Sequence, residues 1–319
     1  MLPNVLPRSE ADPHVPVLAD EVRELLAVQP GETVVDATFG AGGHARLLAE
    51  DLHGRGKLVA IDRDPGVKPH FDRLKALVSV DVRFLRGDFA VVLTQLAAND
   101  VKADAILLDL GISSMQVDRP ERGFSYATDA PLDMRMDPSS ELTAGQIVNT
   151  WDERELAGVF RRYGEERYAG PIARAIVRRR AEQAFFRSGD LVDVIRMALP
   201  TPARFGEGHP AKRVFQALRV AVNDELAQLE SALPAAIRML RPGGRLAVIS
   251  FHSLEDRIVK QAFAAGAKGC TCPTDFPVCV CGKQPELRLL TRRPVRPSAA
   301  EIERNPRSSS SRLRVAVRT

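Results

Sequence analysis

Short apolar runs alternate along most of the chain with segments whose apolar residues recur every three or four positions. The runs lie at 33–36, 58–62, 82–87, 103–109 and 244–250, with two more in LRLLTRR and SSRLRVAVRT near the C-terminus. Helical spacing separates them, for example at 47–52, 71–77 and 91–96. Because helices cover both faces of a parallel sheet in this order, the pattern predicts a Rossmann-like α/β fold.

The middle of the chain departs from that rhythm. A polar loop rich in Asp, Arg and Pro follows residue 115, and helical patterns then succeed one another without a strand between them. These patterns lie at 143–149, 153–163, 169–186 and 189–199. We therefore expect an inserted all-helical domain at residues 115–211, within an α/β domain built from residues 1–114 and 212–319.

One βαβ unit, residues 33–64, carries a glycine-rich turn. Gly40, Gly42 and Gly43 follow its first strand and open its first helix, so that backbone N–H groups can approach a ligand closely. Asp62 ends the second strand, where a carboxylate can accept hydrogen bonds from a ribose diol. The unit predicts a nucleotide-like cofactor.

Two kinds of cofactor fit that turn. The spacing Gly40-x-Gly42-x-x-Ala45 satisfies the dinucleotide fingerprint, which is typical of an oxidoreductase. Asp36, at the end of the first strand, instead favours S-adenosylmethionine (SAM), because a carboxylate suits an ammonium and a sulfonium better than a pyrophosphate. A third interpretation is that Asp36 only caps the turn.

The ends of the later strands carry further candidates, because strand ends line the ligand crevice of an open α/β sheet. Asp88 and Phe89 are placed to bind and stack an adenine, or are a turn acid and a core ring. Asp109 is placed to accept the hydrogens of an amine that receives a methyl group, or to anchor its loop. His252, after the strand at 244–250, would touch a substrate or serve as a structural hydrogen bonder.

The distribution of charge along the chain indicates the kind of partner that the protein binds. The net charge of the 319 residues is only +4, but residues 283–319 carry 10 Lys or Arg against 3 Glu, and residues 154–180 carry 8 Arg against 3 Glu. Such stretches indicate a polyanion such as nucleic acid, although solvated helix faces look similar. Six arginines of the helical region are candidates to follow phosphates: Arg161, Arg162, Arg174, Arg178, Arg179 and Arg180.

The chain shows no sign of a membrane or of export. No apolar run reaches the length that spans a bilayer, and the N-terminus lacks the basic-then-apolar form of a signal peptide. We expect a cytoplasmic protein that does not bind a membrane. Its four cysteines form two pairs, Cys270-x-Cys272 and Cys279-x-Cys281, a clustering that in the cytosol indicates a structural zinc ion before a disulfide.

Eleven segments together resemble the RsmH/MraW family, bacterial methyltransferases that act on the N4 of a cytidine in small-subunit ribosomal RNA. They fall within residues 14–317: HVPVLADEV, DATFGAGGHA, AIDRDP, LLDLGISSMQVD, RGFSY, PLDMRMDP, YGEERYA, IARAIV, HPAKRVFQALRVAVNDEL, GGRLAVISFHSLEDRIVK and NPRSSSSRLRV. DMRMDP and SFHSLEDR are the distinctive ones. The resemblance implies a SAM-dependent methyltransferase sheet with an inserted helical domain that helps to bind the RNA.

The resemblance also implies site residues. The cofactor would be bound by Gly42, Gly43, His44, Asp62, Phe89, Asp109 and Gln116. Around the target base our candidates are Asp109, Ser113, Asp133 and His252. The sequence DLGIS stands where many amino-group methyltransferases have an Asp- or Asn-Pro-Pro-aromatic motif, so their base-orienting mechanism does not transfer.

Three other functions remain open from the sequence. A dinucleotide oxidoreductase would bind NADH and not SAM. A non-catalytic ribosome-assembly factor would bind SAM and RNA without transferring a methyl group, and a DNA cytosine-N4 methyltransferase would prefer duplex DNA. The sequence also leaves open whether the protein is a monomer or a homodimer.

Overall fold

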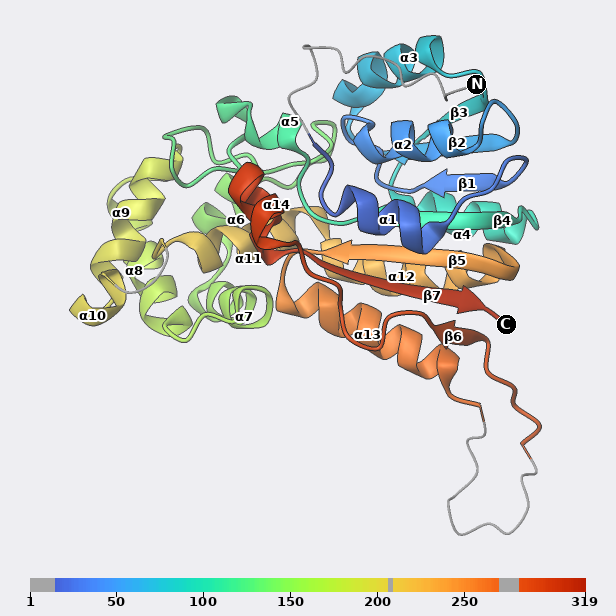
Figure 1. The fold of residues 1–319 in the computed structure, drawn as a ribbon. Coiled ribbons are helices and arrows are strands. Elements are labelled where there is room, and N and C mark those ends of the chain that lie inside the picture. The colour runs from blue at the N-terminus through green and yellow to red at the C-terminus, as the bar shows by residue number, and fades with distance from the viewer. Residues whose placement is uncertain (1–14, 206–208, 270–280) are drawn as a thin grey trace.

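A computed structural model describes residues 15–205, 209–269 and 281–319. Seven strands form one sheet in the order β3-β2-β1-β4-β5-β7-β6, in which β7 is antiparallel to both of its neighbours and the other pairs are parallel (Figure 1). The strands are β1 (Thr33–Asp36), β2 (Lys57–Asp62), β3 (Asp81–Arg86), β4 (Ala103–Asp109), β5 (Leu240–Ser250), β6 (Leu287–Leu289) and β7 (Arg312–Arg318). The predicted Rossmann-like α/β fold is confirmed.

Successive residues of the inner strands enter opposite hydrophobic layers, since side chains alternate along a strand. Val34 packs with Leu107 on one face of the sheet, whereas Val35 packs with Ile106 and Leu108 on the other. All five residues are fully buried. Burial on both faces explains why the strands read as continuous apolar runs rather than as alternating ones.

Helices cover both faces of the sheet. One face is covered by α1 (Ala19–Leu26), α2 (Gly43–Asp51) and α3 (Lys68–Leu77), and the other by α4 (Phe89–Ala98), α12 (Glu225–Met239) and α13 (Ser253–Ala267). The first of these helices, α1, begins at Ala19, after Leu18 in the left-handed region. Asp224, whose φ is 50°, separates α12 from the helix before it, α11 (Lys212–Asn223).

Beside the sheet lies a group of helices with a hydrophobic cluster of its own, which we call the helical unit (Figure 1). Its members are α6 (Ala144–Thr150), α7 (Glu153–Gly164), α8 (Ala169–Glu182), α9 (Ser188–Ala198), α10 (Thr201–Arg204) and α11 (Lys212–Asn223). The helix predicted to continue to Phe186 ends at Glu182, which frees Phe185 to fill the cluster. Because residues of α11 as far as Val222 also belong to it, the packing continues past residue 211.

Two buried polar residues attach the loop between β4 and α6 to the rest of the molecule. Asp64 accepts hydrogen bonds from Gln116 Nε2 at 2.9 Å and from Arg122 Nη1 at 3.0 Å. Asn223, at the end of α11, accepts from the backbone N–H of Met136 at 2.7 Å and donates to the carbonyl of Met134 at 2.8 Å. The loop therefore has a defined conformation that joins the helical unit to the sheet.

Shorter elements complete the chain. They are α5 (Ser114–Val117), α14 (Ala299–Arg304) and the 3-10 turns η1 (Pro65–Val67), η2 (Pro120–Arg122) and η3 (Pro306–Ser310). Within the described ranges, no helix has both the length and the apolar character needed to cross a bilayer.

Asn223→Ala tests the attachment of the loop. The substitution removes the two bonds to the loop and a third to the carbonyl of Arg219, and it leaves buried backbone groups without partners. We expect the free energy of unfolding to fall by about 2–4 kcal/mol, measured by urea denaturation. Asn99→Ala is the control, since the exposed Asn99 side chain makes one bond within its own helix end, and its loss should cost under about 0.5 kcal/mol. Equal effects of the two substitutions would contradict the attachment.

Candidate functional site

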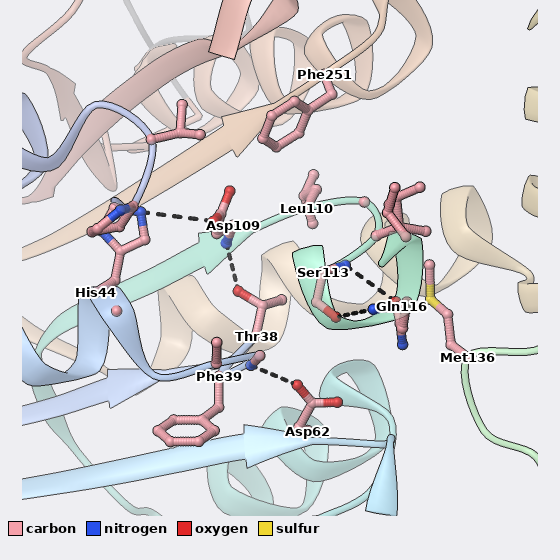
Figure 2. Close-up of a pocket in the computed structure, with 18 of the residues that line it drawn as sticks. Thr38, Phe39, His44, Asp62, Asp109, Leu110, Ser113, Gln116, Met136 and Phe251 are labelled. Carbon is pink, nitrogen blue, oxygen red and sulfur yellow. Dashed lines mark hydrogen bonds and ion pairs between the residues drawn. The ribbon is translucent and has the colours of Figure 1, made fainter. Parts of the chain in front are cut away.

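The carboxyl ends of β1, β2, β4 and β5 open into a cavity of about 860 Å³. Its wall includes the glycine-rich turn, Asp62, Asp109, the loop from Gly111 to Asp118, Phe251 and residues of α11, α12 and η3. Figure 2 shows Thr38, Asp62, Asp109 and Phe251 reaching this space from four different strand ends. A cavity at this edge is where open α/β sheets bind their ligands.

The turn after β1 depends on its glycines. Gly42 has a φ of 82°, and a Cβ there would stand 2.7 Å from the ring of Phe39. Phe39 is held in place because it packs edge-on against Phe71 and Phe84. The turn thus leads into α2 at Gly43 with its backbone against the cavity, and Gly40, Gly43 and His44 line the wall.

Asp62 joins β2 to this turn. One carboxylate oxygen accepts from the N–H of Gly40 at 2.8 Å (Figure 2), and the other accepts from the N–H of Asp64 at 2.9 Å. Burial, partly opposed by these bonds, raises the pKa of Asp62 to about 6. Asp62 lines the cavity together with Phe89 and Gln116, so the structure brings these three predicted cofactor residues to one wall.

Asp36 takes the role of capping the turn. It is buried, and its Oδ1 accepts from the N–H of Thr38 at 3.1 Å. It does not line the cavity, so it offers a ligand no direct contact. Burial raises the pKa of Asp36 to about 7, and the neighbouring charge of Asp62 acts in the same direction.

Asp109 lines the cavity with a carboxyl group whose hydrogen-bonding capacity is only partly used. Its backbone N–H donates to Thr38 Oγ1 at 2.6 Å, which ties the ends of β4 and β1 together, while its buried Oδ1 has no hydrogen-bond partner among the described residues. Burial, aided by the charges of Asp36 and Glu255, raises the pKa of Asp109 to about 8. The free site therefore holds this carboxyl group largely protonated at neutral pH.

His44 does not supply a compensating charge. Its Nε2 lies 3.7 Å from Asp109 Oδ2, too far for a hydrogen bond, and burial lowers the pKa of His44 to about 4. Neither ring nitrogen has full hydrogen-bond geometry with a described residue, and the backbone of Val17 is close enough to oppose part of the fall in the pKa. Acids that pair with no described lysine or arginine, with pKa values raised by desolvation, fit a positively charged ligand such as the sulfonium and ammonium of SAM.

Of the four candidates around the base, two line the cavity and two do not. Ser113 lines the cavity with Asp109, and its N–H donates to Gln116 Oε1 at 3.1 Å. Asp133 lies outside the cavity wall, where its carboxylate pairs with Arg135 at 2.6 Å. His252 is buried beneath the wall and caps the N-terminus of α13 in a capping box with Glu255.

The sequence did not predict several of the residues that line the cavity: Arg219, Glu225, Gln228, Phe251 and Glu255. The segments HPAKRVFQALRVAVNDEL and SFHSLEDRIVK contain four of them, but only as parts of a family resemblance. Helical spacing by itself assigns Arg219 and Glu255 to solvated faces, and only the meeting of α11, α12 and α13 at the sheet edge shows otherwise. Glu225, His252 and Glu255 also have ligand atoms within 4.8 Å of one another, a spacing that a metal ion could use.

The predicted zinc site is not tested. Cys270, Cys272 and Cys279 lie outside the described residues, and Cys281 is exposed at the start of the last described range.

Comparisons with known proteins point in one direction. Residues 11–319 match the model of the MraW methylase family. Relatives called "Ribosomal RNA small subunit methyltransferase H" include one from Heliobacterium modesticaldum, 51% identical over 306 residues, which are 95% of this chain and 97% of the relative. Another, from Symbiobacterium thermophilum, is 52% identical over 309 residues, 96% of each chain. The chain therefore belongs to the MraW methylase family, as its motifs predicted.

Proposed function

We propose that this protein is a SAM-dependent methyltransferase that methylates the N4 amine of a cytidine in small-subunit ribosomal RNA. The observation that carries the proposal is Asp109, whose carboxyl group lines the cavity at the end of β4 and whose Oδ1 receives no hydrogen bond from the described residues. The name of the relatives supports an RNA substrate, and the acid-lined cavity supports the cofactor. The assignment of N4 as the methylated atom rests on the resemblance of the motifs.

The residues that would hold SAM are those of the turn and of the neighbouring strand ends. Gly42 and Gly43 give the ligand access to the N-terminus of α2, Asp62 offers its carboxylate to the ribose, and Phe89 offers a ring to the adenine. When bound, SAM supplies an electrophilic methyl group, which becomes bonded to the amine while sulfur keeps the electrons of the broken bond.

Asp109 suits the acceptor side of this transfer. An ionised Asp109 can accept a hydrogen of the amine, which points the nitrogen lone pair away from the carboxylate, and can take the proton that the amine loses. The low polarity that raises its pKa also makes it a stronger base once it is ionised. None of the described lining residues is a cysteine, which supports direct attack by N4 without a covalent enzyme–base intermediate.

Two basic surfaces support an RNA partner. On the helical unit Arg161, Arg162, Arg174 and Arg178 are exposed. At the mouth of the cavity the C-terminal basic stretch contributes Arg304 and Arg307 to the wall. Arg307 also pairs with Asp118 at 2.6 Å, which holds η3 against the loop that follows β4. A target nucleotide that enters the cavity would pass these arginines with its phosphates.

The direct test is transfer of labelled methyl from SAM to small ribosomal subunits taken from a strain that lacks this gene. Digestion of the RNA and mass spectrometry of its nucleosides should find the label in N4-methylcytidine. Label in another nucleoside would overturn the proposed atom. Binding of SAM and subunits without any transfer would favour a non-catalytic assembly factor, and transfer to duplex DNA alone would favour a DNA methyltransferase.

Asp62→Asn tests the ribose contact. The amide keeps the shape of the side chain but removes the charge and one acceptor, so the affinity for SAM should fall by about 1–3 kcal/mol. Isothermal calorimetry measures the change. Asp81→Asn is the control, because Asp81 is exposed at the start of β3, at the opposite end of the strands from the cavity. This variant should bind SAM as the unaltered protein does. An unchanged affinity of the Asp62 variant would refute the contact.

Binding of SAM should release protons near neutral pH. The raised pKa values of Asp36 and Asp109 mean that both groups hold protons in the free protein below about pH 7 and pH 8, and a cationic ligand favours their ionised forms. Affinity should therefore rise as the pH increases from 6 towards 8. Calorimetry at about pH 6.5 in buffers of different ionisation enthalpy should detect the release, and Asp109→Asn should reduce it. Proton uptake, or none exchanged, would contradict this assignment.

A further inference from the structure

A cluster of buried charges forms part of the cavity wall away from the glycine turn. Arg219 on α11, Glu225 at the start of α12 and Glu255 on α13 all line the cavity that also contains Asp109 and Phe251. Their side chains are 14%, 9% and 2% exposed. Charges are rarely buried unless they are paired, so three of them at one wall require a reason.

Arg219 uses one edge of its guanidinium and leaves the other available. Nε donates to Glu225 Oε1 at 2.8 Å, and Nη2 donates to Glu225 Oε2 at 2.9 Å. These are the only hydrogen bonds that the guanidinium makes with described residues. Nη1 and the second hydrogen of Nη2 therefore form a free pair of parallel donors, in a plane that Glu225 holds.

Glu255 is fixed just as firmly. Its carboxylate accepts from the backbone N–H of Phe251 at 2.8 Å and lies 3.2 Å from His252 Nε2. Although burial opposes ionisation, His252 and Arg219 hold the pKa of Glu255 below its usual range. An ionised Glu255 keeps the guanidinium charged and adds to the negative field at Asp109.

A metal ion is a poorer occupant of this cluster than a ligand that accepts hydrogen bonds. Arg219 already places a positive charge on both oxygens of Glu225, and Glu255 already accepts backbone N–H groups. The groups of the cluster that remain available to a ligand are therefore the N–H donors of Arg219. A divalent cation at Glu225 and Glu255 would also lie beside the guanidinium and be repelled by it.

The two adjacent donors of Arg219 match two adjacent acceptors on one edge of cytosine, N3 and O2. Cytosine and adenine share an amine next to a ring nitrogen acceptor, but only cytosine continues that edge with a second acceptor, O2. The forked donors of an arginine are suited to two neighbouring acceptors on one base edge. With the amine directed to Asp109, N3 and O2 of cytosine follow along the same edge of the ring.

We propose, on the basis of the proposed function, that the free edge of Arg219 binds N3 and O2 of the target cytosine and makes the site specific for that base. Glu225 sets the plane of the guanidinium, and Glu255 preserves its charge. Arg219 is a specificity-determining residue, because adenine would present a C–H group where cytosine presents O2. It acts beside Asp109, which serves the amine.

The test is a double-mutant cycle in which Arg219 and the target base are altered separately and together. Subunits are rebuilt with cytidine or 3-deazacytidine, which lacks the N3 acceptor, at the position that the labelling experiment identifies. The protein carries Arg219 or Arg219→Lys, which keeps the charge but not the fork. On cytidine the lysine variant should lose roughly 10- to 100-fold in kcat/KM. On 3-deazacytidine the same substitution should cost several-fold less, because the contact to N3 is already absent.

Three controls keep the result interpretable. SAM affinity of the variant, measured by calorimetry, should stay within about twofold of the original, which shows an intact fold. Arg219→Gln with Glu225→Gln removes both charges of the pair together and should show the same coupling if the lysine variant does not fold. Arg238→Gln, exposed near the end of α12 that precedes β5, should leave all rates unchanged.

Each outcome decides between the proposals. Equal losses on cytidine and 3-deazacytidine would overturn the role of Arg219 while leaving the methyltransferase function intact. An unaltered protein that methylates no cytidine would overturn the proposed function and the role of Arg219 with it. A smaller loss on the deaza substrate supports direct contact with N3, since a merely structural defect would affect both bases equally.

Discussion

Three carboxyl groups that pair with no described lysine or arginine, at the ends of β1, β2 and β4, are the constraint on which the site depends. Asp36, Asp62 and Asp109 lie close together because parallel strands end at one edge, and the hydrogen bond from the Asp109 N–H to Thr38 fixes that edge. Burial opposes their ionisation and raises their pKa values. A cationic ligand reverses this balance, so ligand binding and ionisation of the site are one event.

The second wall of the cavity depends on polar contacts between distant segments. Asp64 holds Gln116 and Arg122, and Asn223 holds the backbone around Met134 and Met136. Each of these side chains is buried or nearly so, so its bonds are worth more than they would be in water. They bring α11, whose apolar residues belong to the helical unit, to the edge of the sheet.

This arrangement divides the chemistry between two walls. The wall made by the strand ends is acidic and suits a sulfonium cofactor, whereas α11 contributes a guanidinium that suits the acceptor atoms of a base. Asp109 at the end of β4 and Glu255 on α13 differ in their state, since burial raises the pKa of Asp109 while His252 and Arg219 lower that of Glu255. Such a separation allows one acid to exchange a proton while the other stays charged.

The sequence by itself determined the strands, the glycine turn and the family, because strand burial, turn chemistry and motifs are local patterns. It also identified Asp62 and Asp109, since a strand end in a parallel sheet has a known place. Only the tertiary structure decided that Asp133 pairs with Arg135, that His252 caps a helix, and that Arg219 meets Glu255. Arg219 and Glu255 come from separate helices, and although the partners of Asp133 and His252 are near in sequence, helical or strand periodicity does not record whether a side chain turns to such a partner or to the cavity.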